Sequence, residues 1–207
     1  MDFRRNVRAH LLAGEFKQAE LICPALRIDI GERLEGILAD GGVTARQFPS
    51  PNRNDRQVVR EIRSEKLHAM MNAEGRLETL LAEQNVQGEQ TVPGTGKAKP
   101  TITKFVADRL TAKFAAATNQ VQTMVAERNV TIEQDGRTAH GSHAHYDGAS
   151  QVLELTGQPT AVAPEGRITE AEVLVWDAAK EQLRVKGKFK SEWQRLRTAR
   201  MDEALKR

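Results

Sequence analysis

Apolar and polar residues alternate along much of this chain. A period of two predicts strands with one buried and one solvated face. We expect strands near residues 64–71, 107–114, 121–134, 142–147, 151–157, 168–177 and 181–190. The apolar members of the alternating stretches include Leu26, Ile28, Ile30, Leu67, Ala69, Met71, Leu110, Ala112, Phe114, Ala171, Val173, Val175, Leu183 and Val185.

Equivalent positions also recur along the sequence. Three stretches, beginning at Ala25, Lys66 and Arg109, align with one another, and chance does not keep three registers together. The aligned positions, 43 and 44 residues apart, are Ala39, Ala82 and Ala126; Val43, Val86 and Val130; and Gln47, Gln90 and Gln134. Residues 64–84 also suit a helix, but the same slots elsewhere hold β-favouring residues such as Val130 and Ile132, which favours strands.

A shorter repeat follows near the C-terminal end. The matching pairs, each 30 residues apart, are Tyr146 and Trp176, Asp147 and Asp177, Leu153 and Leu183, and Gly157 and Gly187. Each unit consists of an aromatic residue and Asp, a turn of small residues, an alternating strand and Gly. The turns predicted between paired strands are DIGER, NAEGR, AATNQ, DGAS and DAAKE.

Several segments depart from the repeat. Residues 48–58 and 91–101 are rich in Pro, Gly and charge and predict long loops. Residues 192–207 carry good helix formers and predict a short helix or a frayed tail. Asn6 and Val7 match Asn85 and Val86 without a preceding strand, so we expect the chain to begin inside a unit, as a fragment would.

The composition is that of a globular protein with an aliphatic core. Of the 207 residues, 39% are hydrophobic and only 4% aromatic, which suits one elongated domain. No apolar run approaches the length of a membrane span or the core of a secretory signal. Cys23 is the one cysteine, and we expect it to be a buried small hydrophobe.

Charge is concentrated at the C-terminal end. Residues 186–207 hold eight Lys or Arg against three Asp or Glu, while the whole chain has a net charge of +3. A basic end attracts phosphate on nucleic acid, an anionic membrane or a glycolipid, and the shortage of aromatics argues against nucleic acid. The basic side chains expected to meet an anionic partner include Lys186, Lys188, Lys190, Arg195, Arg197 and Arg200.

Catalytic and metal motifs are weak. His140, His143 and His145 invite a metal site, but no further ligand with defined spacing accompanies them, so we expect exposed strand histidines and no metal. The Gly96 and Lys97 pair lacks the spacing of a phosphate-binding loop. With no catalytic grouping in view, the sequence predicts neither an enzyme nor a cofactor.

The repeat units resemble the OstA-like family of lipopolysaccharide transport proteins, which includes LptA, LptC and the N-terminal domain of LptD. The resemblance covers about residues 1–190 and is carried by ADRLTAKF, MVAERNVTIEQ, HAHYDGASQVLELTGQP and ITEAEVLVWD. It implies an all-β fold, an elongated, twisted β-jelly roll of repeated antiparallel strand pairs over residues 1–191, followed by a basic helix or tail over residues 192–207.

The resemblance also implies a function. Members hold the lipid A part of lipopolysaccharide in an apolar groove and stack end to end by strand pairing into a periplasmic bridge, with other bridge proteins or with themselves as partners. If this chain is periplasmic, its signal or anchor lies outside the sequence. The groove residues implied are Leu26, Ile28, Leu67, Ala69, Met71, Leu110, Ala112, Phe114, Val130, Ile132, Tyr146, Leu153, Leu155, Val173, Val175, Leu183 and Val185.

Other interpretations of the same residues stay open. The apolar rows also suit ordinary core packing, although the small Ala69 and Ala112 at their centres would leave room for an acyl chain. A structural β-repeat scaffold that polymerises through its end strands is the main alternative. An extracellular carbohydrate-active enzyme would need clustered carboxylates, for which the sequence offers no candidates.

Overall fold

The computed structural model describes residues 1–13, 16–49, 58–94, 99–116, 120–178, 180 and 182–193. Its regular elements are fourteen strands of one antiparallel sheet. The first eight are long: β1 (Asp2–Ala13), β2 (Phe16–Ile30), β3 (Leu34–Gln47), β4 (Val59–Met71), β5 (Leu77–Val92), β6 (Thr101–Phe114), β7 (Val121–Gln134) and β8 (Arg137–Asp147). The remaining six are short: β9 (Val152–Thr156), β10 (Thr160–Ala163), β11 (Gly166–Thr169), β12 (Val173–Asp177), β13 (Gln182–Lys186) and β14 (Lys190–Trp193).

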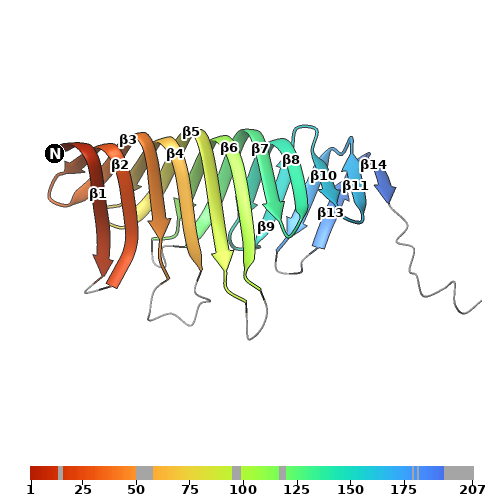
Figure 1. Ribbon diagram of the computed structural model, residues 1–207, viewed down its shortest axis with the longest axis horizontal. Helices are drawn as coiled ribbons and strands as arrows, with labels where there is room; N and C mark the ends of the chain where they lie inside the picture. Colours follow the sequence, from red (N-terminus) through yellow and green to blue (C-terminus); the bar gives the residue numbers. More distant parts are fainter. Residues whose placement is uncertain are drawn as a thin grey trace, which may run out of the picture.

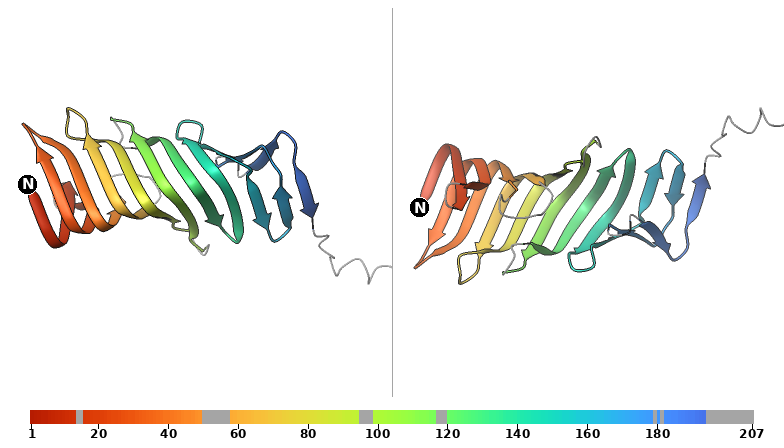
Figure 2. Two further views of the ribbon diagram at one scale, coloured as in Figure 1. Left: turned by 90° about the horizontal axis from the view of Figure 1, so that it is seen from above. Right: turned by 90° about the horizontal axis from the view of Figure 1, so that it is seen from below.

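The all-β prediction is confirmed, and the helical alternative for residues 64–84 is wrong because these residues form β4 and β5. From β1 to β8 each strand pairs with the next one in the sequence. Figures 1 and 2 show the result, an elongated, twisted row of strands with the N-terminus at one end and β14 at the other. No helix in the described part of the chain is long and apolar enough to cross a membrane.

Each long strand bends near its middle, so the sheet is folded along a line that we call the corner (Figure 1). Pairing registers shift there; in β7 and β8, for example, the step from Glu127 to Val130 lies opposite the step from His143 to Gly141. The extra residue is a β-bulge, which bends a strand and increases its twist. The corner therefore divides the sheet into two leaves that face each other.

Left-handed backbone produces the bend in the odd-numbered strands. Two consecutive residues have positive φ at Gly41–Gly42 in β3, Gln84–Asn85 in β5 and Arg128–Asn129 in β7, and Arg5–Asn6 repeats the feature in β1. Glycine and asparagine tolerate this conformation better than other residues. Asn6 was matched to Asn85 from the sequence alone, and the two residues have the same backbone role.

The repeated Ala and Val positions lie on either side of the bend. Ala39 and Val43, Ala82 and Val86, and Ala126 and Val130 are all at most 5% exposed. They belong to two buried clusters that together run along the corner. The repeated Ala and Val positions in the sequence are therefore the residues that pack on either side of the bend in each of these strands.

In the C-terminal third the strands break at the corner. β8 pairs with β9 through one half and with β10 through the other. Gly157 and Gln158 connect β9 to β10 with positive φ, as Glu170 does between β11 and β12 and Gly187 between β13 and β14. The single strands predicted at 168–177 and 181–190 are therefore wrong in one respect: each is interrupted where the chain crosses from one leaf to the other.

The front leaf of Figure 1 contains β10, β11 and β14, and the rear leaf contains β9, β12 and β13. The predicted turns lie at the ends of paired strands, and in AATNQ and DAAKE residues 117–119, 179 and 181 lie outside the described residues. The segments expected as long loops, 48–58 and 91–101, lie between β3 and β4 and between β5 and β6, except that Thr91 and Val92 belong to β5 and Thr101 to β6. Residues 50–57 and 95–98 lie outside the described residues. Glu192 and Trp193, expected at the start of the tail, complete β14, and residues 194–207 lie outside the described residues.

Candidate functional site

The candidate site is the apolar interior between the two leaves. Directly paired residues of antiparallel strands project from the same face, so the register identifies which side chains point inward. One inward row crosses the rear leaf beside the corner: Leu26, Ala39, Leu67, Ala82, Leu110, Ala126, Ala144, Leu155 and Leu174. The inward face is thus apolar from strand to strand for most of the length of the protein.

Burial decreases from the corner to the free margin of each leaf. Leu67 and Leu110, beside the corner, are each 3% exposed. Met71 and Phe114, two alternations further out on the same strands, are half-buried. The interior is therefore sealed along the corner and partly accessible along the margin.

Most of the implied groove residues lie in this interior. The buried ones are Leu26, Leu67, Ala69, Leu110, Ala112, Val130 and Leu155. The half-buried ones are Ile28, Met71, Phe114, Ile132, Tyr146, Leu153 and Val185. Leu183 points inward through its pairing with Trp176, in the same row as Leu153 and Tyr146, but it is 44% exposed near the C-terminal end.

Val173 and Val175 are misplaced in the sequence-based set. The register pairs Leu155 with Leu174, so Leu174 and Trp176 point inward and the two valines point to the outer face. On that face Val173 is half-buried and Val175 is only 6% exposed. Ala171 is buried in the core where the chain crosses the corner after Glu170, which has φ of 54°. The next inward residue is Leu174, three positions later. A period of two continued through residues 171–175 therefore selected the wrong face.

The expectation of free space at Ala69 and Ala112 is also wrong for this structure. Ala69 is 6% exposed and Ala112 is 3% exposed. Small side chains allow two leaves to approach closely, and protein interiors pack to high density. The alanines thus bring the leaves together rather than keep them apart.

Sequence reasoning missed several inward residues. Ala82, Val86 and Ala126 were recognised as repeat positions but not as interior, and Ala107, Ala144, Ile168 and Leu174 were not recognised at all. The spacing of Ala82 and Val86, on either side of a Gln-Asn pair, was the available signal. Phe105 is another inward residue, and it fills the space over Gly88, where an added Cβ would come within 1.8 Å of the ring.

The free margins of the two leaves differ in chemistry. On the front leaf, Arg60 points inward and its guanidinium donates to Gln90 Oε1 at 3.0 Å and to Gln47 Oε1 at 3.2 Å. Tyr146 points inward from the rear leaf. Burial raises the pKa of the Tyr146 hydroxyl, and the positive charge of Arg60 opposes that rise.

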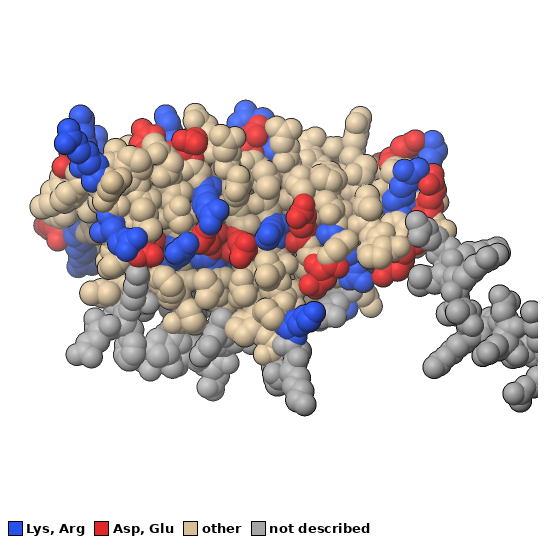
Figure 3. Space-filling model, viewed as in Figure 1, with Lys and Arg blue, Asp and Glu red and all other residues tan. Residues whose placement is uncertain are grey.

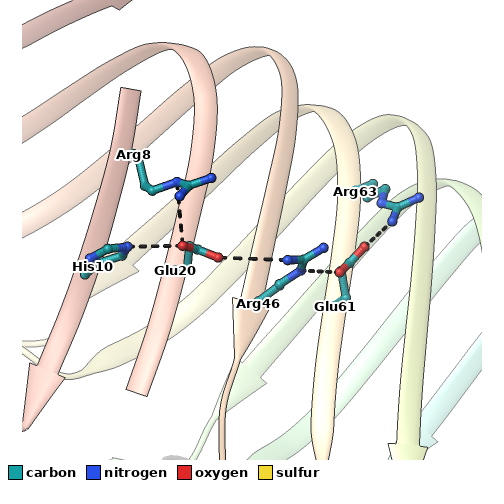
Figure 4. Close-up of polar contacts among 6 residues, drawn as sticks. All are labelled: Arg8, His10, Glu20, Arg46, Glu61 and Arg63. Atoms are coloured by element: carbon teal, nitrogen blue, oxygen red, sulfur yellow. Dashed lines mark hydrogen bonds and ion pairs between the residues drawn. The ribbon is translucent and has the colours of Figure 1, made fainter. Parts of the chain in front are cut away.

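Outside the interior, charged side chains form a band across the front leaf (Figure 3). Glu20 lies 3.1 Å from His10, and Arg46 contacts both Glu20 and Glu61 (Figure 4). Burial alone would raise the pKa of Glu61, but hydrogen bonds from Arg46 and Arg63 outweigh it and hold the pKa below its usual value. Cross-strand ion pairs of this kind favour one strand register over its alternatives.

In the described part of the basic C-terminal end, Lys186 and Lys190 form ion pairs with acidic residues. Lys186 Nζ lies 2.6 Å from Glu154 and Lys190 Nζ lies 2.6 Å from Glu170. The backbone N–H of Lys188 donates to Glu172. Arg195, Arg197 and Arg200 lie outside the described residues, so the anionic partner expected for this end stays a prediction.

Cys23 is 2% exposed, as expected, and burial raises the pKa of its thiol. His140 and His145 are exposed strand residues, whereas His143 is half-buried. Thr131 Oγ1 lies 2.9 Å from His140 Nδ1. Within the described ranges, no three His, Cys, Asp or Glu side chains are grouped as metal ligands would be.

No protein-family model and no curated protein matches this chain. A solved structure that is similar is described as LptH of Pseudomonas aeruginosa, the LptA-homologous periplasmic component of the conserved lipopolysaccharide transport device. The two chains share 12% sequence identity, the match covers 85% of this chain and 94% of LptH, and the TM-score is 0.48.

Proposed function

We propose that this protein holds the acyl chains of lipid A between its two leaves and passes lipopolysaccharide along a periplasmic bridge. The observation that carries the proposal is the inward apolar row, which continues from β2 to β13 and becomes half-buried toward the margin. A lipid carrier in water needs a long apolar surface that is shielded from solvent but can be reached from one side. Each methylene moved from water into such a surface contributes about 0.8 kcal/mol.

The closed corner defines where acyl chains enter. Side chains beside the corner already contact both leaves, so a lipid enters from the margin, at the level of Met71 and Phe114. The acyl chains then replace contacts between the leaves. This mode of entry uses the half-buried positions and leaves the alanine-lined corner intact.

Two adjacent methionines provide a test. Met71 points inward and is half-buried, whereas Met70 points outward and is 40% exposed. We expect lipopolysaccharide to co-purify with the native chain from a diderm bacterium, as measured by mass spectrometry of lipid A. Met71→Asp should reduce the amount about tenfold or more, because a carboxylate opposes entry of an acyl chain.

Met70→Asp is the matched control and should retain the native amount of lipid. Absence of lipid from the native chain, or equal losses in the two variants, would contradict binding between the leaves. Circular dichroism of both variants checks that the sheet is preserved.

A scaffold that polymerises through its end strands is the second candidate, and the exposed edge favours it. In the described chain β1 pairs only with β2, and Phe3, Leu11 and Leu12 are 44%, 53% and 58% exposed. Open, apolar edges recruit further strands. The same edge also supports end-to-end pairing within a bridge.

Sedimentation with and without bound lipopolysaccharide separates the two candidates. The scaffold forms polymers without carrying lipid, whereas the bridge subunit carries lipid whether or not it associates. Leu11→Lys combined with Leu12→Lys should suppress polymers in both cases.

A further inference from the structure

The inward face of the front leaf changes character at its free margin. Two residues beyond the inward positions of Ala45, Ile62, Gly88, Phe105, Ile132 and Ala139, the register brings a row of polar side chains into line across six strands. On β5 the half-buried Val92 points inward two residues further out. The row consists of Gln47, Arg60, Gln90, Thr103, Gln134 and Arg137. We call this row the polar lip, and it contains the repeated glutamine position of the sequence.

Arg60 is held in place by the two glutamines beside it in the polar lip. It lies between Gln47 and Gln90 on the neighbouring strands and donates one hydrogen bond to each carboxamide oxygen. A guanidinium can only donate, so its contacts determine the orientation of both amides. Each amide therefore turns its oxygen to Arg60 and keeps its NH₂ group as a donor for something else.

The opposite margin is apolar. Met71, Leu77 and Phe114 point inward at the edge of the rear leaf and are half-buried. Tyr146, which also points inward from that leaf, is close enough for the charge of Arg60 to affect its ionisation. Arg137, the other arginine of the polar lip, lies 3.8 Å from Glu165. The mouth of the interior thus has one lip with N–H donors and the positive charge of Arg60, and one lip suited to hydrocarbon.

We propose that Gln47, Arg60 and Gln90 bind a phosphate group on the head of the lipid whose acyl chains lie between the leaves. The proposal rests on the proposed function and adds the site that orients the head group. Guanidinium groups recognise phosphate through strong, charge-assisted hydrogen bonds, and amide donors on both sides supply further contacts to its oxygens. Acyl chains lying against Met71 and Phe114 would bring the head group to this lip.

Arg60→Gln tests the site, because it removes the charge while retaining a polar side chain. Arg63→Gln is the matched control: Arg63 lies on the outer face of the same strand and is 59% exposed. Binding is measured with the full chain by displacement of a fluorescent fatty acid. The competitors are lipid A with its phosphates, the same lipid A with its phosphates removed, and inorganic phosphate alone.

We expect phosphorylated lipid A to compete about tenfold better than the dephosphorylated form with the native chain. Arg60→Gln should abolish that difference, and Arg63→Gln should keep it. Inorganic phosphate should not displace the fatty acid, because it does not occupy the interior.

The failure of each proposal looks different. Equal competition by the two forms of lipid A with the native chain would overturn the phosphate site and leave the acyl site in place. A phosphate preference that survives in Arg60→Gln would also overturn the phosphate site. Failure of the native chain to bind the fluorescent fatty acid would overturn the acyl site and with it the phosphate site.

Discussion

The corner and the margins of the interior are built from similar apolar residues but differ in packing. At the corner, Ala82 and Val86 have no exposed surface, and the left-handed pair between them fixes the bend. At the margin, Met71 and Phe114 are only half-buried, and they face a polar lip. The difference indicates a division of roles: the corner stabilises the folded sheet, and the margin is the part that can exchange contacts between leaves for contacts with a ligand.

The largest effect is expected from a charge at the corner. Val86→Asp should lower the free energy of unfolding by about 3 kcal/mol or more, because it buries a carboxylate in an apolar cluster. Met71→Asp should lower the free energy of unfolding by clearly less than Val86→Asp, because water reaches the half-buried position 71. Urea unfolding of both variants measures the difference, and equal costs would show that the corner and the margin are packed alike.

A smaller effect is expected from the backbone of the bend. Asn85 is exposed and has φ of 54°, so its conformation, not its packing, makes it suitable there. Asn85→Ile should cost about 1–2 kcal/mol, since a β-branched residue is strained in the left-handed region. Asn85→Gly should change the stability little, as measured by thermal unfolding. A large loss of stability in the glycine variant would show instead that the asparagine side chain makes a stabilising contact.

The smallest effect concerns acidification. Asp177 ends β12 and accepts a hydrogen bond from Lys180 Nζ at 2.8 Å, which, with the nearby Arg184, holds the pKa of Asp177 below its usual value. A lowered folded-state pKa gives stability that is present above the unfolded pKa of about 4 and is lost as pH falls through the folded value. We therefore expect stability to fall on acidification below about pH 4.

Asp177→Asn should be less stable than the native chain near neutral pH and should lose less stability on acidification. Urea midpoints across this pH range test the expectation. The cost of Val86→Asp, in contrast, should shrink at low pH, because a protonated carboxyl is easier to bury. Parallel pH profiles for the two variants would contradict the assignment of ionic contacts to β12 and of apolar packing to the corner.

Much of the fold could be predicted from residue patterns, because alternation and repetition are local. The strands, turns and repeated Ala and Val positions followed from the sequence. The bend did not, although Gly41–Gly42, Gln84–Asn85 and Arg128–Asn129 occupy equivalent positions and include residues that tolerate positive φ. Whether such a pair bends its strand depends on how it is paired with the neighbouring strand, where the register shifts. A single sequence does not show that pairing.

The candidate site shows the same limit. The residues near Leu110 were assigned correctly because the alternation is uninterrupted within one half of a strand. Val173 and Val175 were assigned to the inward face because the alternation was continued from Ala171, which is buried at the corner itself. The burial of Ala112 could not be predicted from the sequence, because it depends on how closely the two leaves approach each other.

The central claim is that acyl chains enter the interior from its margin, and photo-crosslinking at neighbouring positions tests it most directly. Phe114 points inward at the margin and Lys113 points outward beside it. A photoreactive phenylalanine derivative at position 114 should capture lipopolysaccharide in living diderm cells, and the same group at position 113 should not. Equal capture at both positions, or none at position 114 in a chain that folds normally, would contradict the claim.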